Sequence, residues 1–245
     1  MPGHVDGTAV VLGVGPGLGM SMAHRLGRGG HTLALVSRTP ERHTGYIDEL
    51  AGAGIKAVSF TVDVRDTARL AATLSTISAQ LGPVNVLYYG PGSVSDTDAR
   101  PKPITDISGK DVEEAMTFVH PALEAVQAVL PGMRARKSGA LLFAGGLSSV
   151  LPLPALGAYA LSFAALRNYA LTLNAALTED GVYAGTLTIG GLVERGDIHR
   201  FVAAHPDRYG DLTAKTLSPD DIAAEAWSMI TTRTRAETVF NALTP

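Results

Sequence analysis

A glycine-rich run near the start of the chain is the first feature whose residue types indicate chemistry. The run GVGPGLG lies between an apolar, β-branched segment (8–12) and an amphipathic one (20–26). Small residues at such a turn let a pyrophosphate approach backbone N–H groups at a helix N-terminus. The run therefore predicts a dinucleotide site, although the strict G-x-G-x-x-G spacing is not met. An ordinary glycine-rich turn is the alternative. The residues expected to touch the dinucleotide are Gly13, Gly15, Pro16, Gly17, Leu18 and Gly19.

Polar residues that end the next two apolar runs indicate which dinucleotide is bound. The second run ends in Ser37 and Arg38, where an NAD site would carry an acid for the ribose 2′-hydroxyl. A guanidinium can instead pair with a phosphate, which favours NADP(H); a solvated surface arginine is the alternative. Asp63 and Val64 follow the third run. The Asp63 carboxylate could accept a hydrogen bond from an adenine amino group, and helix capping would explain it equally well.

Short apolar runs alternate with amphipathic ones along the whole chain, which predicts a parallel sheet covered on both faces. The expected strands are 8–12, 32–37, 57–62, 84–89, 140–144, 183–189 and 237–241. The expected helices are 20–26, 40–53, 67–81, 111–130, 156–177 and 222–230. Pro40 suits a first helical turn, and Pro121 should kink or break its helix. We expect one α/β domain over residues 1–245, a Rossmann-like doubly wound sheet, with 194–217 as a substrate lid.

Composition narrows the class of protein further. The chain has no cysteine, which excludes disulfides, thiolate metal sites and a cysteine nucleophile. Its seven histidines never form an H-x-x-x-H pair, so we expect no metal site. A net charge of −3 disfavours a nucleic-acid partner. The start has no basic n-region, and no apolar run reaches the roughly 18 residues that span a bilayer. We therefore expect a cytoplasmic protein with no membrane contact.

Taken together, these features resemble the short-chain dehydrogenase/reductase family over essentially the whole chain. The glycine spacing, Arg38, Asp63, Tyr159 in a long apolar helix, and the LPGM run at 130–133 that closes the preceding helix all fall in register. The resemblance implies a dimer or tetramer that reduces carbonyls or oxidises alcohols with a nicotinamide cofactor. It also implies cofactor contacts at Gly90, after the fourth strand, and at Gly190, after the sixth.

In this alignment three of the family's four catalytic residues are replaced. The Y-x-x-x-K motif keeps Tyr159 but has Phe163 for its lysine, while Gly146 stands at the serine position and Phe118 at the asparagine position. A free phenol has a pKa of about 10, so about one in a thousand is ionised at pH 7. Tyr159 would then be a poor base for alcohol oxidation but an available acid for carbonyl reduction; a tyrosine that merely packs in its helix is the alternative. The lost lysine would also have stabilised oxyanion charge.

Neighbouring polar residues could substitute for the missing ones, although each also has a purely structural interpretation. Ser148 or Ser149 could take the serine role, Ser162 lies next to the lysine position, and His120 lies near the asparagine position. We expect an NADP(H)-dependent reductase of a small carbonyl or enone, with Tyr159 as proton donor and Ser148 orienting the substrate. The alternatives are a catalytically silent NADP-binding sensor or scaffold, and a chain that binds only the adenine half.

Two further segments bear on partners and substrate. The helix expected over 156–177 is apolar almost all round, which predicts burial on more than its core face. Since the resembled family packs this helix against another subunit, we expect a homo-oligomer; an internal, sandwiched helix is the alternative. The expected lid carries His199, Phe201, His205 and Tyr209, which indicates a mixed polar and aromatic pocket for a small-molecule substrate.

Overall fold

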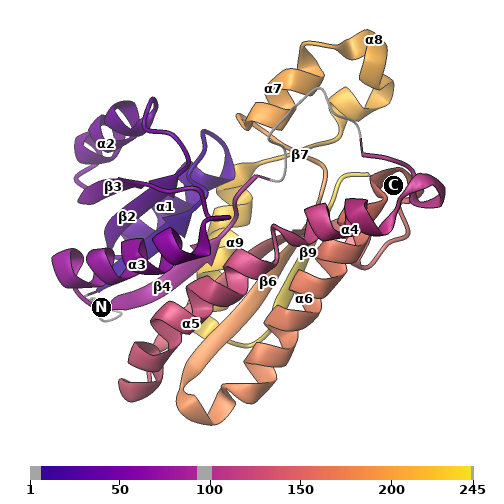
Figure 1. Ribbon diagram of the computed structural model, residues 1–245. Helices are drawn as coiled ribbons and strands as arrows, with labels where there is room; N and C mark the ends of the chain where they lie inside the picture. The colour runs from indigo at the N-terminus through magenta and orange to yellow at the C-terminus, as the bar shows by residue number, and fades with distance from the viewer. Residues whose placement is uncertain (1–6, 93–100, 244–245) are drawn as a thin grey trace.

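Seven parallel strands form the central sheet of the computed structural model, which describes residues 7–92 and 101–243 (Figure 1). All six strand pairings of this sheet are parallel. In spatial order the strands are β3 (Ala57–Thr61), β2 (Thr32–Ser37), β1 (Thr8–Leu12), β4 (Val84–Tyr89), β5 (Gly139–Gly146), β6 (Val182–Gly190) and β9 (Glu237–Asn241). Every residue of β1 is buried, as expected for a strand that helices cover on both faces.

The helices form two layers, one on each face of the sheet (Figure 1). One layer contains α1 (Leu18–Arg28), α2 (His43–Gly52) and α9 (Pro219–Thr232). The other contains α3 (Thr67–Leu81), α5 (His120–Ala135) and α6 (Ala158–Ala176), and α4 (Gly109–Met116) leads into α5. Each layer packs its own buried apolar cluster against the sheet, so the predicted doubly wound α/β fold is confirmed. Among the described residues, no helix is long and apolar enough to cross a membrane.

The segment expected as a lid extends beyond the carboxyl edge of the sheet, at the top of Figure 1. It starts from a two-stranded sheet of β7 (Leu192–Val193) and β8 (Thr216–Leu217). Between these strands lie α7 (Asp197–Ala203), α8 (Pro206–Tyr209) and the 3₁₀ turn η5 (Gly210–Ala214). Of residues 194–217, Val202 alone is buried, so little apolar packing holds this segment to the core. Such segments open at low free-energy cost.

The prolines show where local rules hold and where packing overrides them. The break expected at Pro121 is confirmed, because α4 ends before α5 begins and Pro121 lies in the first turn of α5. Pro40 was wrongly expected inside α2, which begins at His43. The 130–133 run does not close its helix either, because α5 continues through Pro131 to Ala135. Burial of α5 side chains on both sides of Pro131 offsets the one hydrogen bond that proline removes.

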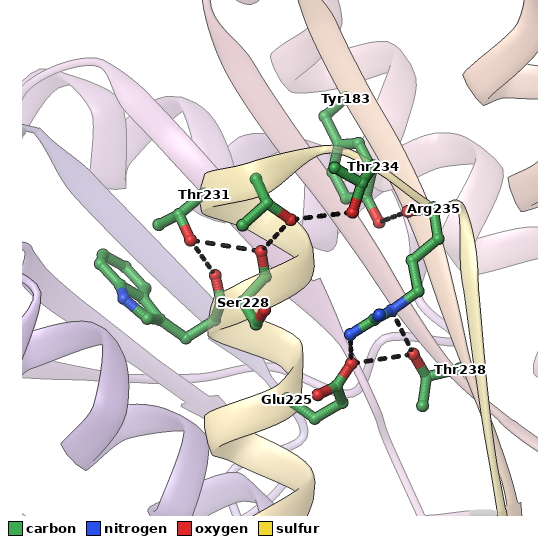
Figure 2. A network of polar contacts seen from close by, with 9 residues as sticks. Tyr183, Glu225, Ser228, Thr231, Thr234, Arg235 and Thr238 are labelled. Atoms are coloured by element: carbon green, nitrogen blue, oxygen red, sulfur yellow. Dashed lines mark hydrogen bonds and ion pairs between the residues drawn. The ribbon is translucent and has the colours of Figure 1, made fainter.

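A polar network fastens the edge strand β9 to α9 (Figure 2). The Arg235 guanidinium pairs with Glu225 on α9 and donates from Nε to Thr238 Oγ1 at 3.1 Å. Thr238 in turn donates to Glu225 Oε1 at 3.2 Å, and the Tyr183 hydroxyl donates to the Arg235 carbonyl at 2.8 Å. The network holds the last strand in register, and with it the chain that follows, whose Leu243 lines the cleft described next.

Candidate cofactor and substrate site

The glycine run lies at the point where the sheet changes direction. β1 lies between β2 and β4, so successive connections leave it toward opposite edges, and ligands bind outside the carboxyl ends of strands at such a point. Gly13 has φ +93°, and a Cβ there would lie 2.5 Å from the Gly90 carbonyl oxygen. A Cβ at Gly17 would lie 2.9 Å from the Gly196 backbone nitrogen. Glycine is therefore required at both positions, because other backbone segments pass directly against them.

A cleft of about 880 Å³ runs along this edge of the sheet, large enough for a cofactor and a small ligand. All twelve residues expected to bind the dinucleotide contribute to its wall, although they come from five separate β-strand ends. They are Gly13, Gly15, Pro16, Gly17, Leu18, Gly19, Ser37, Arg38, Asp63, Val64, Gly90 and Gly190. The structure thus brings the set together, while the role of each residue toward a cofactor stays a prediction.

One end of the cleft carries charged side chains and is called here the charged end. Its members follow β2 and β3, and they are Arg38, Glu41, Arg42, Asp63 and Arg65. The Asp63 carboxylate accepts hydrogen bonds from the Arg65 backbone N–H and guanidinium, both at 3.0 Å, which lower the pKa of Asp63 to about 2. The residue that caps α3 is Asp66, so helix capping does not explain Asp63. Arg38 is exposed in the wall.

An ion pair joins the charged end to the base of the expected lid. Arg42 Nη1 donates to Asp197 Oδ2 at 2.7 Å, and this bond raises the pKa of Arg42. Asp197 begins α7, and both side chains line the cleft. Nothing in the sequence pattern predicted the pair, because 155 residues separate its partners. The contact joins the start of α2 to the start of α7.

At the opposite end, two aromatic side chains line the cleft and a third packs against them. Phe118 and Phe163 contribute to the wall. The Tyr159 ring stacks on Phe163, with 6.3 Å between centroids and 28° between planes, and also lies 6.3 Å from Phe118. Tyr159 itself is not part of the wall. Burial, with a smaller contribution from Glu114, raises its pKa, so the phenol stays protonated to higher pH than a free one.

The polar residues considered as substitutes lie outside the wall. Ser148 and Ser149 have buried hydroxyls with no hydrogen-bond partner among the described residues, and neither lines the cleft. Ser162 donates to the Tyr159 carbonyl at 3.2 Å, which agrees with the purely structural interpretation of this serine. His120 is exposed at the start of α5, also away from the wall. In this conformation the cleft therefore receives no side-chain donor from any of the four.

The histidines and aromatic residues of segment 194–217, the expected lid, were wrongly expected to line the pocket. Phe201 packs against His205, with ring centroids 4.5 Å apart, and against Tyr209, at 6.0 Å, within the lid itself. None of the lid's histidines or aromatic residues reaches the wall; Ile198 and Leu212 do. Apart from Asp197 at its base, this segment thus presents apolar side chains to the cleft, because its aromatic residues are used in its own packing.

Gly146 and Phe163 share one space. A Cβ at Gly146 would lie 2.5 Å from Phe163 Cδ2, closer than real Cβ atoms approach a neighbour. The backbone of Gly146 is extended, with φ −107° and ψ 150°, a conformation open to any residue. The constraint is therefore steric: while the Phe163 ring keeps this position, no side chain fits at 146.

A doubly wound parallel sheet, with a glycine-rich turn at its switch point and a cleft across its carboxyl edge, defines a Rossmann-type dinucleotide-binding protein. The family model described as short chain dehydrogenase matches residues 7–196. The chain belongs to this family, whose members are NAD(P)-binding oxidoreductases.

Individual relatives agree with this assignment. A short chain dehydrogenase of Pseudocercospora fijiensis is 31% identical over 190 residues, which cover 76% of this chain and 59% of the relative. A very-long-chain 3-oxoacyl-CoA reductase of Aspergillus oryzae is 30% identical over 182 residues, 71% of this chain and 50% of the relative. The chain thus spans little more than half the length of these curated relatives.

Solved structures show the same fold. L-sorbose reductase from Gluconobacter frateurii, complexed with NADPH and L-sorbose, superimposes with a TM-score of 0.84 at 20% identity, over 99% of this chain and 98% of that one. A metagenomic short-chain oxidoreductase in complex with NADP gives a TM-score of 0.77 at 21% identity, over 96% of each chain. At these identities the likeness concerns the fold.

The shared space of Gly146 and Phe163 predicts coupled stability. We expect Gly146→Ala to lower the free energy of unfolding by about 1–3 kcal/mol, because the added methyl displaces the ring. In Phe163→Ala the space is open, so Gly146→Ala should cost at least about 1 kcal/mol less there. Urea unfolding of the two single variants and the double variant measures this difference. Gly45→Ala, at an open position on α2, is the control. Its effect on the free energy of unfolding should be the same with and without Phe163→Ala. Simple additivity of the 146 and 163 changes would contradict the steric account.

Proposed function

We propose that the protein is an NADP(H)-dependent reductase of a small carbonyl or enone. The observation that carries the proposal is the composition of the cleft wall, where the glycine turn at the switch point and Arg38 at the end of β2 belong to one continuous surface. Backbone N–H groups of such a turn suit a pyrophosphate, and a guanidinium suits the 2′-phosphate that distinguishes NADP from NAD. The NADP and NADPH in the two similar structures above support this choice of cofactor.

Cofactor choice can be tested at Arg38. We expect Arg38→Asp to weaken NADPH binding about 100-fold, because a charge-assisted hydrogen bond to the phosphate is replaced by repulsion. NADH lacks that phosphate, so its affinity should change by less than about threefold. Calorimetric titration of both cofactors measures the difference. Lys56→Asp makes the same change of charge at an exposed site outside this cleft, and should affect neither affinity. Equal losses for NADPH and NADH in Arg38→Asp would contradict the assignment.

The residues around Tyr159 favour reduction over oxidation. When bound, the nicotinamide supplies the hydride. In our proposal Tyr159 donates a proton to the carbonyl oxygen of the substrate, and the Ser148 hydroxyl orients that oxygen. Neither side chain lines the cleft in this conformation, so the proposal requires both to turn toward it when the substrate binds. Phe163 takes the position of the family's lysine, so position 163 supplies no ammonium to lower the pKa of the phenol, and burial raises it. The resulting phenol is protonated at neutral pH. It can therefore act as a proton donor, whereas a general base would have to be ionised.

Removal of the phenol tests this role. We expect Tyr159→Phe to lower kcat for carbonyl reduction at least about 100-fold, the usual contribution of a general acid, with NADPH affinity unchanged. The wild-type rate should stay flat up to pH about 10, because a raised pKa keeps Tyr159 protonated. Initial rates of NADPH oxidation with a carbonyl panel, across pH, measure both effects. Tyr169→Phe, on the same helix with its ring against Phe143, is the matched control and should keep activity.

A catalytically silent NADP-binding sensor or scaffold is the second candidate. It is favoured by the cleft wall, which includes Phe118 and Phe163 but neither Tyr159 nor Ser148. In that case the cofactor would bind with normal affinity, while no carbonyl compound would turn over and Tyr159→Phe would change nothing. A chain that binds only the adenine half would instead hold NADPH and 2′-phospho-ADP-ribose equally well. These outcomes separate the three possibilities.

We further propose that the protein is a homo-oligomer in which α6 packs against a second copy. Within one chain, α6 buries Ser162, Leu166 and Ala170, while Leu161 is 45% exposed. The apolar character of this helix is therefore not explained by the core alone. On helix α5, Leu123 is a second exposed apolar side chain, at 36%.

Assembly can be tested at Leu161. We expect Leu161→Glu to shift the protein to a monomer in sedimentation velocity, because an interface would have to bury an unpaired carboxylate. Val150→Glu places the same charge on another exposed apolar residue outside α6, and should leave the assembly unchanged. A wild-type protein that sediments as a monomer at concentrations of about 10 μM would refute the proposal.

A further inference from the structure

The end of the cleft away from the charged end is built from apolar side chains. We define it by Phe118, Leu153, Leu156, Phe163, Ile198 and Leu212. These come from the α4–α5 junction, the connection between β5 and α6, helix α6 and the lid, so elements far apart in sequence converge on one surface. We call it the apolar end. It lies where β4, β5 and β6 terminate, the part of the cleft where the reactive ring of a bound dinucleotide and the substrate would meet.

Charge is absent from the apolar end, as far as the described residues show. Each charged side chain of the wall follows β2 or β3, with the exception of Asp197. Asp197 is engaged by Arg42, so its charge is already compensated. A carboxylate or phosphate on the substrate would therefore find no counter-ion among the described residues of this end, and burying an unpaired charge is costly.

Side-chain hydrogen-bonding groups are also missing from this part of the wall, again among the described residues. Between the apolar side chains, the wall consists of glycine, alanine and proline, for example Gly145, Gly190 and Gly191. The nearby hydroxyls of Ser148 and Ser149 are buried outside the wall. A polyhydroxylated substrate would leave buried hydroxyls unpaired, and each would weaken binding about tenfold. An alkyl chain or aryl ring would instead bind favourably, because its apolar surface leaves water and contacts the apolar wall.

We propose that the apolar end binds an uncharged, apolar carbonyl compound, with an alkyl or aryl substituent in contact with Phe118, Phe163 and the leucines, and that it discriminates against sugars and sugar acids. The Phe163 ring, which lines this end, offers an aromatic contact for an aryl group. The proposal rests on the reductase function proposed above, and names the substrate class for the same site.

A homologous series of ketones tests the substrate class. We measure binding of 2-butanone, 2-hexanone and 2-octanone by calorimetry, with the full chain saturated with NADP⁺, so that no reduction occurs, and again with no cofactor added. Each added methylene should tighten binding about fourfold, the usual gain for burying one CH₂. Fructose, a ketone that carries hydroxyls, should bind at least about 100-fold more weakly than 2-hexanone. An affinity independent of chain length, or fructose binding as tightly as hexanone, would overturn the proposal.

A pair of matched variants locates the binding surface. Leu156 lines the apolar end, while Val150, six residues earlier, is 44% exposed and does not line it. We expect Leu156→Asp to weaken 2-octanone binding at least about tenfold with cofactor affinity unchanged, and Val150→Asp to have no effect. Leu212→Asp tests the same surface from the lid if Leu156→Asp does not fold. Unchanged octanone binding in a folded variant of either leucine would show that the ketone binds elsewhere.

The two proposals fail in different ways. If NADPH and NADH both give no heat on mixing, the reductase function is wrong, while the ketone series without cofactor still decides the substrate class. If a dinucleotide binds and ketone affinity does not depend on chain length, the apolar substrate class is wrong and the reductase function stands. Chain-length dependence without turnover supports an apolar binding site in a catalytically silent protein.

Discussion

Direct contact between backbone segments, with no side chain between them, is the constraint on which the site depends. At the switch point Gly13 lies against the end of β4, and Gly17 lies against the backbone that leads into α7. A single methyl group at either position would separate the first turn from its neighbours. The turn after β1, the ends of β4 and β6, and the chain around Gly196 would then no longer form one continuous cleft wall. Because these contacts are formed by main chain, later changes in side chains can alter what the cleft binds without altering its position.

Charged and apolar side chains lie at different ends of the cleft, after different strands. Charge is concentrated after β2 and β3, where Arg38 and its neighbours stand, and apolar surface occupies the side of β4, β5 and β6. This separation follows from the topology, since the chain fills one half of the sheet before it begins the other. A bound dinucleotide would lie with its phosphorylated ribose among charges and its reactive ring among carbon atoms. Weak solvation at the second end would strengthen any hydrogen bond formed there.

Most of the fold could be predicted because buried parallel strands are continuous apolar runs, a local signal. β1, β2, β4 and β9 begin and end at the predicted residues, and the glycine turn lies where its spacing placed it. The extent of α5 was missed because its packing overrides the effect of Pro131, and packing is not local. The Arg42–Asp197 pair was missed for the same reason. Alignment register located Tyr159 on its helix, but register alone does not determine whether a side chain reaches the cleft.

The shared space of Gly146 and Phe163 also limits the order in which this chain could have acquired its present residues. In its present position the Phe163 ring leaves no room for a Cβ at 146. An ancestor with a side chain at 146 would therefore have lost stability by acquiring phenylalanine at 163 first, and would have avoided that cost if glycine came before it or together with it. The same rule applies in reverse. A substitution at 146 alone displaces the Phe163 ring and lowers stability. A return to an earlier pair of residues therefore costs least when position 163 changes first.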